Sequence, residues 1–239
     1  MTANTDPNAI DYVTSAAKAV LGMVPFAGSL LAELAGTVIP NQRIDRLSKF
    51  SIQLESKLTG FDQDLIRAKL KDENFTDLLE STARQAAQAI TEERRAYLAT
   101  LIANGIDGER LTFVESKQIL RLLGEINDIE VVWLRFYLHP YFGGDTEFRE
   151  KHKAVIEPIS ATLGSDQATL DKHSLQANYL QHLVSLGLLE RPYQIDSKSG
   201  YPVFDKMKND WKTKGHQLTP LGRLVLRQIG FSLESAREE

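Results

Sequence analysis

Residues 20–40, VLGMVPFAGSLLAELAGTVIP, constrain the fold more than any other stretch, because so apolar a segment must be buried. From Ala19 to Ile39, 14 of the 21 residues are apolar, and a segment that crosses a bilayer needs about 20. The stretch also contains Pro25, three glycines and Glu33. A carboxylate at the bilayer centre costs about 3 kcal/mol. The sequence therefore leaves two interpretations open: a buried helical hairpin bent at the proline, or an amphipathic membrane inserter.

The polar and small residues of this stretch recur at intervals of three, four or seven, which places them on one narrow stripe of a helix. They are Thr14, Lys18, Gly22, Ser29, Glu33 and Gly36. Such a stripe suits a core hairpin, and it also suits an inserter that turns its polar side to a neighbouring copy. In the second case the membrane-interacting residues would be Leu21, Phe26, Leu30, Leu31, Leu34 and Val38.

Apolar spacing along the rest of the chain predicts mainly helices. We expect helices over 8–24, 26–39 and 42–58, a short helix ending near residue 70, and one long helix over 74–104. The charged run TEERR at 91–95 should be solvated. The predicted core positions are Ile44, Leu47, Ser51, Leu54 and Leu58, then Phe75, Leu78, Leu79, Ala86, Ile90, Leu98, Leu101 and Ile102.

Local capping signals predict the next boundaries. Thr112 and Glu115 form a capping box ahead of a helix, and Asn127 or Asp128 caps another helix that ends by Pro140. A weaker helix is expected over 147–163. Residues 160–172, SATLGSDQATLDK, are small and polar, so we expect a hinge there.

From about residue 167 the pattern changes to a helix that stops at Gly187, a short strand, a β-hairpin over 193–216, and a closing helix. Thr219 caps that last helix, and Pro220 takes its first position. This order is typical of a winged helix-turn-helix. The predicted fold is therefore mainly α, with an apolar helical hairpin and a C-terminal winged helix. The expected regions are 1–58, 59–164 and 165–239.

Within the predicted winged helix, Leu175, Leu180, Leu183 and Leu186 should face the core and His182 should be exposed. The candidate contacts to a partner or nucleic acid are Gln176, Asn178, Gln181, Lys198, Lys206 and Lys208. Residues 191–214 hold six Lys or Arg against three Asp, a charge that suits phosphates. The candidate recognition helix carries only Lys172 as a cation. Protein contact therefore ranks ahead of DNA binding.

No motif that carries enzyme chemistry occurs in the sequence. The chain has no cysteine, which excludes disulfides, thiolate zinc sites and cysteine nucleophiles. Its five histidines fall in no metal-ligand pattern, and no phosphate-binding glycine loop or nucleophile elbow occurs. The net charge of −4 argues against a protein that binds nucleic acid over its whole surface. We expect no enzyme activity, no cofactor and no metal.

Three groups of core and capping residues form one further pattern: Leu101, Ile102, Ala103 and Asn104; Leu120, Leu123 and Asp128; and Leu218, Thr219, Pro220, Leu221 and Gly222. In this pattern, residues 94–230 resemble bacterial abortive-infection proteins of the alpha type. Where the family has His-Pro before its middle helix, this chain has Phe113-Val114. The resemblance implies an anti-phage role in a bacterial cytosol, and it transfers no site residues.

These observations lead to one functional expectation and one alternative. The leading expectation is a non-enzymatic anti-phage protein that docks a protein partner or phage component through its winged helix and acts on a membrane through its apolar hairpin. Such a protein would be a cytoplasmic homo-oligomer, with attachment to the inner membrane when the hairpin is exposed. The alternative is a DNA-binding winged-helix regulator whose N-terminal helices dimerise. An N-terminus that is polar and acidic up to Lys18 shows no export signal.

Overall fold

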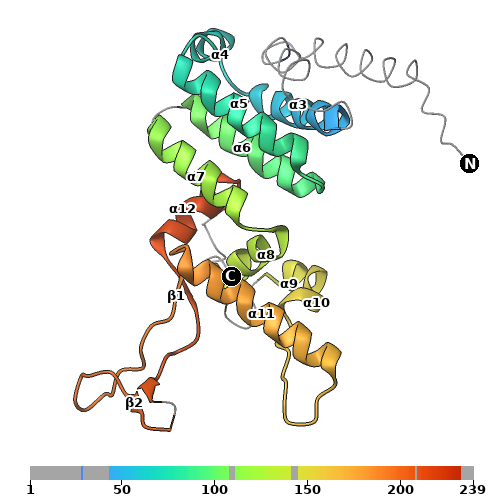
Figure 1. Cartoon of the computed structure of the whole chain (residues 1–239). Coiled ribbons are helices and arrows are strands. Elements are labelled where there is room, and N and C mark those ends of the chain that lie inside the picture. Colours follow the sequence, from blue (N-terminus) through green and yellow to red (C-terminus); the bar gives the residue numbers. More distant parts are fainter. Residues whose placement is uncertain (1–27, 29–42, 108–110, 141–144, 208, 233–239) are drawn as a thin grey trace, which may run out of the picture. The chain divides into compact units, whose positions relative to one another are not determined.

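The computed structural model describes residues 28, 43–107, 111–140, 145–207 and 209–232. The chain divides into two compact units. Unit 1 extends to Gly124 and includes Gln228–Gly230, and unit 2 comprises Glu125–Arg227 and the residues from Phe231 onward. Most described residues are helical, and two small two-stranded sheets lie in unit 2 (Figure 1). The predicted mainly α fold is therefore confirmed.

The helices expected over 8–24 and 26–39 lie outside the described residues. The division of the chain into three regions stays a prediction. No helix in the described part of the chain combines the length and the apolar character needed to span a bilayer.

Unit 1 is built on three helices that pack against one another: α3 (Ile44–Leu58), α5 (Glu73–Gln88) and α6 (Glu92–Asp107) (Figure 1). A short helix, α4 (Gln63–Lys69), packs on α6, and α7 (Phe113–Glu125) follows. All five predicted core positions of α3 are confirmed. The buried residues of α3 are Ile44, Leu47, Phe50, Ser51, Leu54 and Leu58.

The single long helix predicted over 74–104 is wrong, because a turn separates α5 from α6. Ala89 takes an extended conformation, and the side-chain oxygen of Thr91 accepts a hydrogen bond from the Arg94 amide (3.2 Å), which starts the new helix. Ile90, expected in the core, has 82% of its surface exposed. The other predicted core positions are buried: Phe75, Leu78, Leu79, Ala86, Leu98, Leu101 and Ile102.

The charged run at 91–95 is only partly solvated, which corrects the expectation for it. Arg94 and Arg95 are buried, and their guanidinium groups donate to carbonyls at helix ends. Arg94 Nη1 donates to Leu123 O (2.8 Å), and Arg95 Nη1 donates to Ala89 O (2.9 Å) at the end of α5. Basic groups satisfy the free carbonyls and complement the dipole at a helix C-terminus. Arg95 therefore fixes the corner between α5 and α6, while Arg94 ties the C-terminal end of α7 to α6.

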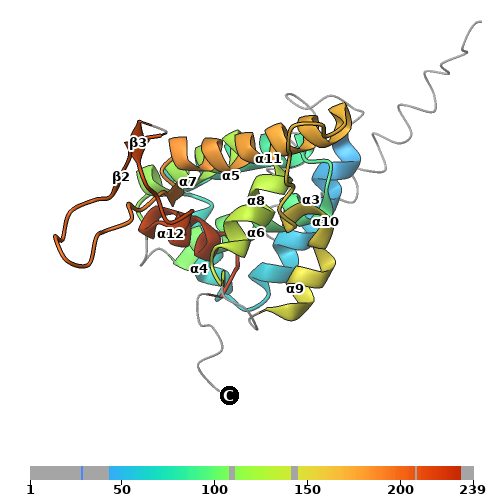
Figure 2. The same ribbon diagram turned by 90° about the horizontal axis from the view of Figure 1, so that it is seen from below.

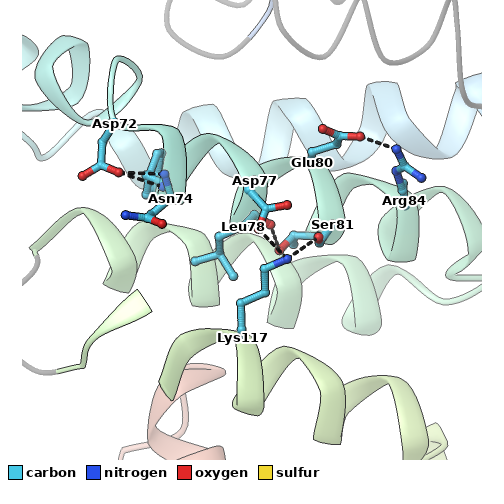
Figure 3. Close-up of polar contacts among 10 residues, drawn as sticks. Asp72, Asn74, Asp77, Leu78, Glu80, Ser81, Arg84 and Lys117 are labelled. Atoms are coloured by element: carbon cyan, nitrogen blue, oxygen red, sulfur yellow. Dashed lines mark hydrogen bonds and ion pairs between the residues drawn. The ribbon is translucent and has the colours of Figure 1, made fainter. Parts of the chain in front are cut away.

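The predicted capping box at the start of α7 is confirmed. Glu115 Oε2 accepts from the Thr112 amide (2.7 Å), while the Thr112 hydroxyl accepts from the Glu115 amide (3.4 Å). Figure 3 shows Lys117 of α7 reaching Asp77 (2.7 Å) and Ser81 (2.9 Å) of α5. These contacts hold α7 against α5 on the surface of unit 1.

Unit 2 begins with α8 (Asp128–Phe136), α9 (Thr146–Lys151), α10 (Lys153–Ile156) and α11 (Gln167–Ser185), and both α10 and α11 contact α8 (Figure 2). The predicted cap at Asn127 is confirmed. The weaker helix expected over 147–163 is wrong beyond its first half. α10 ends at Ile156, and the residues from Ser160 to Ser165 form no helix. The last six residues of the expected hinge belong to α11, and the hinge itself stays a prediction.

The rest of unit 2 has four short strands and a final helix. β1 (Leu189–Glu190) pairs with β4 (Gln217–Leu218), and β2 (Phe204–Asp205) pairs with β3 (Asp210–Trp211), both antiparallel. The closing helix, α12 (Pro220–Gln228), begins where the sequence predicts it, and the Thr219 hydroxyl accepts from the Gly222 amide (3.0 Å). A Cβ at Gly222 would lie 2.3 Å from Leu188 O, so only glycine allows α12 to approach β1 this closely.

Candidate docking surface

The sequence-predicted site residues fall on separate parts of the chain. The six membrane-interacting candidates, Leu21, Phe26, Leu30, Leu31, Leu34 and Val38, lie outside the described residues, as does Lys208. Lys198 and Lys206 are exposed on two different turns of the hairpin between β1 and β4. The three amide candidates belong to α11 instead. The structure therefore places the lysines and the amides on different elements.

The side-chain amide of Gln176 makes its hydrogen bonds within unit 2. Its amide oxygen accepts from the Ile159 amide (3.1 Å), and its amide nitrogen donates to Glu157 O (3.0 Å) and Val155 O (3.3 Å). These bonds tie the segment after α10 to α11, so this side chain has no donor left for a base edge. Asn178 and Gln181 are exposed.

The predicted core face of α11 is confirmed only at its C-terminal end. Leu183 is fully buried, Leu180 and Leu186 are half-buried, and Leu175 is 53% exposed. Leu175 instead lines an open groove of about 570 Å³, together with Ile129 and Trp133 of α8. His182, expected to be exposed, is half-buried, and its Nδ1 lies 2.6 Å from Glu130 Oε1. Glu130 is buried, so this contact joins α11 to α8.

The hairpin is more compact than a simple two-stranded ribbon, because three of its segments pair with one another. Gln194 donates its amide to Lys212 O (2.7 Å), Lys212 to Val203 O (2.8 Å), and Val203 to Gln194 O (2.8 Å). Single bridges join Tyr193 to Thr213 and Ile195 to Pro202. This ring of backbone bonds fixes the far end of the hairpin.

A β-bulge at Gly215 determines which side chains share a face. Glu190 is opposite Gln217, whereas Tyr193 is opposite Thr213, so the second strand has one extra residue between them. Gly215 has a φ of +87°, which glycine adopts without strain. On the strand that includes β4, the extra residue reverses which side chains point to each side of the hairpin. The side that is buried at β1 and β4 therefore continues into the side that carries Tyr193.

This face of the hairpin is apolar and half exposed. Opposite residues of paired strands point to the same side, as do residues two apart along a strand. Four large apolar side chains meet there, with 44–52% of their surfaces exposed: Tyr193, Ile195, Phe204 and Trp211. The ring of Trp211 lies 5.1 Å from that of Phe204 and 6.5 Å from that of Tyr193, both edge to face. We call these four residues the hairpin face.

The same hairpin carries several exposed cations, at its turns and on the side opposite the hairpin face. The exposed basic residues of the hairpin are Arg191, Lys198, Lys206, Lys212 and Lys214. The aspartates of the hairpin serve its turns: Asp196 accepts from the Lys198 and Ser199 amides (both 2.8 Å), and Asp205 from the Met207 amide (3.0 Å). Backbone hydrogen bonding lowers the pKa of Asp196. No ion pair joins the five cations to a carboxylate among the described residues.

The base of the hairpin is anchored in unit 2. Leu189 and Leu218 are opposite each other and buried, and the Thr219 hydroxyl donates to Gly187 O (2.7 Å). His216 packs on the ring of Tyr137, 5.8 Å between centroids. Burial, followed by the nearby Arg191 guanidinium, lowers the pKa of His216 below its ordinary value of 6.5. The hairpin face therefore projects from a base that is held by contacts within unit 2.

The part of the chain that the structure describes has no group of three or more His, Asp or Glu side chains placed to hold a metal ion.

Sequence reasoning missed the hairpin face. Its signal was present, because polar Gln194 separates Tyr193 from Ile195, and Asp210 and Lys212 flank Trp211, as in a one-sided strand.

The known proteins add no further constraint on this site. The chain matches no protein-family model, no curated protein and no solved structure.

Proposed function

We propose that this chain is a non-enzymatic docking protein, and that unit 2 binds an anionic partner through the hairpin face. One observation carries the proposal: four large apolar side chains lie half exposed on an anchored hairpin that also carries five exposed cations, none of them ion-paired within the described residues. An exposed apolar cluster of this kind marks an interaction site. The cations of the hairpin give the sign of the partner's charge.

The winged-helix interpretation of unit 2 belongs to this proposal. The order α11, β1, hairpin, β4 and α12 supports it, as does the closed base between Leu189 and Leu218. In such a module the hairpin is the wing. The alternative of a duplex-DNA regulator that reads bases with α11 is weakened, because the bonds that Gln176 makes within unit 2 occupy its amide.

The resemblance to alpha-type abortive-infection proteins suggests the setting in which docking would act. We propose that the chain takes part in bacterial anti-phage defence, with residues 20–40 as its membrane-active or homo-oligomeric element. Docking at the hairpin would then be the event that triggers or recruits this element. The role of residues 20–40 stays a prediction from the sequence.

Site-specific photo-crosslinking tests whether the hairpin docks anything. Tyr201 of the hairpin and Val114 of unit 1 are each 73% exposed, so they form a matched pair. With p-benzoylphenylalanine at Tyr201 in the full chain, we expect an adduct in cells, and none with the same residue at Val114. The adduct should disappear when Tyr193 and Trp211 are also replaced by Ser. Equal adducts at both positions, or none at Tyr201, would contradict the proposed docking.

A further inference from the structure

We infer that the anionic partner of the hairpin face is single-stranded nucleic acid. This inference rests on the proposed docking function and names its ligand. Single-strand binding surfaces combine aromatic rings on which bases stack with cations that follow the phosphates. The hairpin supplies three rings on one side, from Tyr193, Phe204 and Trp211, and cations at its two turns, Lys198 and Lys206.

The kind of cation favours a polyanion over a protein. Aromatic residues and arginine are enriched at protein interfaces, whereas lysine is depleted there. Four of the five described cations of the hairpin are lysines, and they are exposed and form no ion pair within the described part of the chain. Lys212 and Lys214 alternate with Trp211 and Thr213, so they point to the opposite side of the hairpin, while Lys198 and Lys206 lie at the two turns beside the rings. Lysines suit the phosphates of a flexible strand.

Ring orientation favours a single strand over a duplex. The planes of Phe204 and Tyr193 lie at 80° and 65° to the plane of Trp211. Bases stacked on these rings cannot remain parallel to one another, as bases in a duplex must. A single strand can turn its bases outward one at a time.

The turns of the hairpin argue against a lipid surface. Asp196 and Asp205 build the two turns, so insertion into a bilayer would carry both carboxylates toward the lipid. Burying carboxylates there is unfavourable. Phosphate groups on a strand can instead contact the lysines beside these turns, Lys198 and Lys206, without displacing the aspartates.

The intrinsic fluorescence of Trp211 gives a direct readout of stacking. The chain has two tryptophans, and Trp133 is buried, so Trp133→Phe in the full chain leaves Trp211 as the only reporter. We expect a 12-nucleotide dT strand to quench Trp211, with an affinity that falls as salt rises. A 12-base-pair duplex should bind more weakly and quench less. Trp211→Ala should weaken strand binding about tenfold or more, Trp211→Tyr should restore most of it, and Ile52→Ala in unit 1 should change nothing.

Lysine variants test the phosphate contacts separately. Replacing Lys198 or Lys206 with Gln should lower the slope of log affinity against log salt by about 0.7 for each phosphate that the lysine neutralises. Circular dichroism of each variant checks that unit 2 remains folded. Tighter binding to duplex, strand binding without quenching of Trp211, or binding only to phosphatidylglycerol vesicles would overturn the inference. An adduct at Tyr201 that contains only protein would also overturn it, while leaving the proposed docking in place.

Discussion

The sequence predicts a core face for both α3 and α11, yet the fold uses the two helices differently. α3 buries six of its 15 residues against α5 and α6, whereas α11 fully buries only Leu183 among 19 residues. The difference arises from their neighbours. α3 has helices packed along it, while the first half of α11 faces an open groove, where Leu175 is half exposed.

The hairpin also has an apolar face that neighbouring elements cover at one end and leave exposed at the other. Leu189 and Leu218 are buried at its base, and the same face continues outward through Tyr193 to Trp211 without a covering element among the described residues. An apolar pattern shows which side chains favour burial, and not whether a partner surface exists within the chain. Apolar residues left uncovered on an anchored element are therefore the place to look for a binding partner.

The largest effect should come from the matched pair Leu54→Ala and Leu175→Ala. Leu54 is fully buried in α3, so its truncation leaves a cavity and should lower the free energy of unfolding by about 3 kcal/mol. Leu175 is half exposed, so the same change should cost less than about 1 kcal/mol. Urea denaturation followed by circular dichroism measures both. Equal losses would mean that α11 is as well covered as α3.

Gly222→Ala should have the next largest effect, because it forces α12 away from β1. The new methyl group would meet Leu188 O at 2.3 Å and the Leu218 side chain at 2.7 Å. Overpacking of this kind costs about 2 kcal/mol, and we expect it to loosen the base of the hairpin. Gly60→Ala is the control, since nothing lies within 4 Å of its Cβ position. A Gly222→Ala protein as stable as the control would argue against the close contact.

The Glu130–His182 contact should contribute a smaller, separable amount. We expect a double-mutant cycle with Glu130→Gln and His182→Ala to give a coupling of about 1 kcal/mol, because the side chains meet at 2.6 Å and the carboxylate is buried. The matched control pairs Glu130→Gln with exposed Gln181→Ala, for which the coupling should vanish. A zero coupling for the first pair would show that other contacts hold α11 on α8.

The sequence predicted the elements whose determinants are local. The capping residues Thr112 and Asn127, and the turn into α12 at Thr219, were found because each cap lies within three residues of its partner. The break at Ala89 was missed, since the apolar spacing continues through it. The burial of Arg94 was missed because its acceptor, Leu123 O, is 29 residues away.

The candidate site was predicted only in part, for the same physical reason. The lysines of the hairpin could be located from composition, but their relation to the aromatic rings depends on register. The bulge at Gly215 shifts that register by one residue, and its effect depends on the pairing of Tyr193 with Thr213, which is a tertiary contact. The bonds of Gln176 to the segment after α10 are likewise tertiary.

The smallest effect should appear in the pH dependence of unfolding. Burial lowers the pKa of His216 in the folded state, so the unfolded state binds more protons as pH falls below about 6.5. Stability should therefore be greatest above that pH and decline toward pH 5.5. His216→Gln should reduce the decline slightly, while His139, whose pKa is also lowered by burial, retains part of it. A steeper decline in His216→Gln than in the unmodified chain would mean that the imidazole is protonated when folded.

Acrylamide quenching of the two tryptophans tests the central claim most directly, because that claim is an uncovered hairpin face. Trp133 is 4% exposed and Trp211 is 45% exposed. In the full-length Trp133→Phe protein we expect acrylamide to quench Trp211 readily, and in the Trp211→Phe protein we expect Trp133 to be shielded. If Trp211 is shielded as strongly as Trp133, another part of the chain already covers the face, and the docking account is wrong.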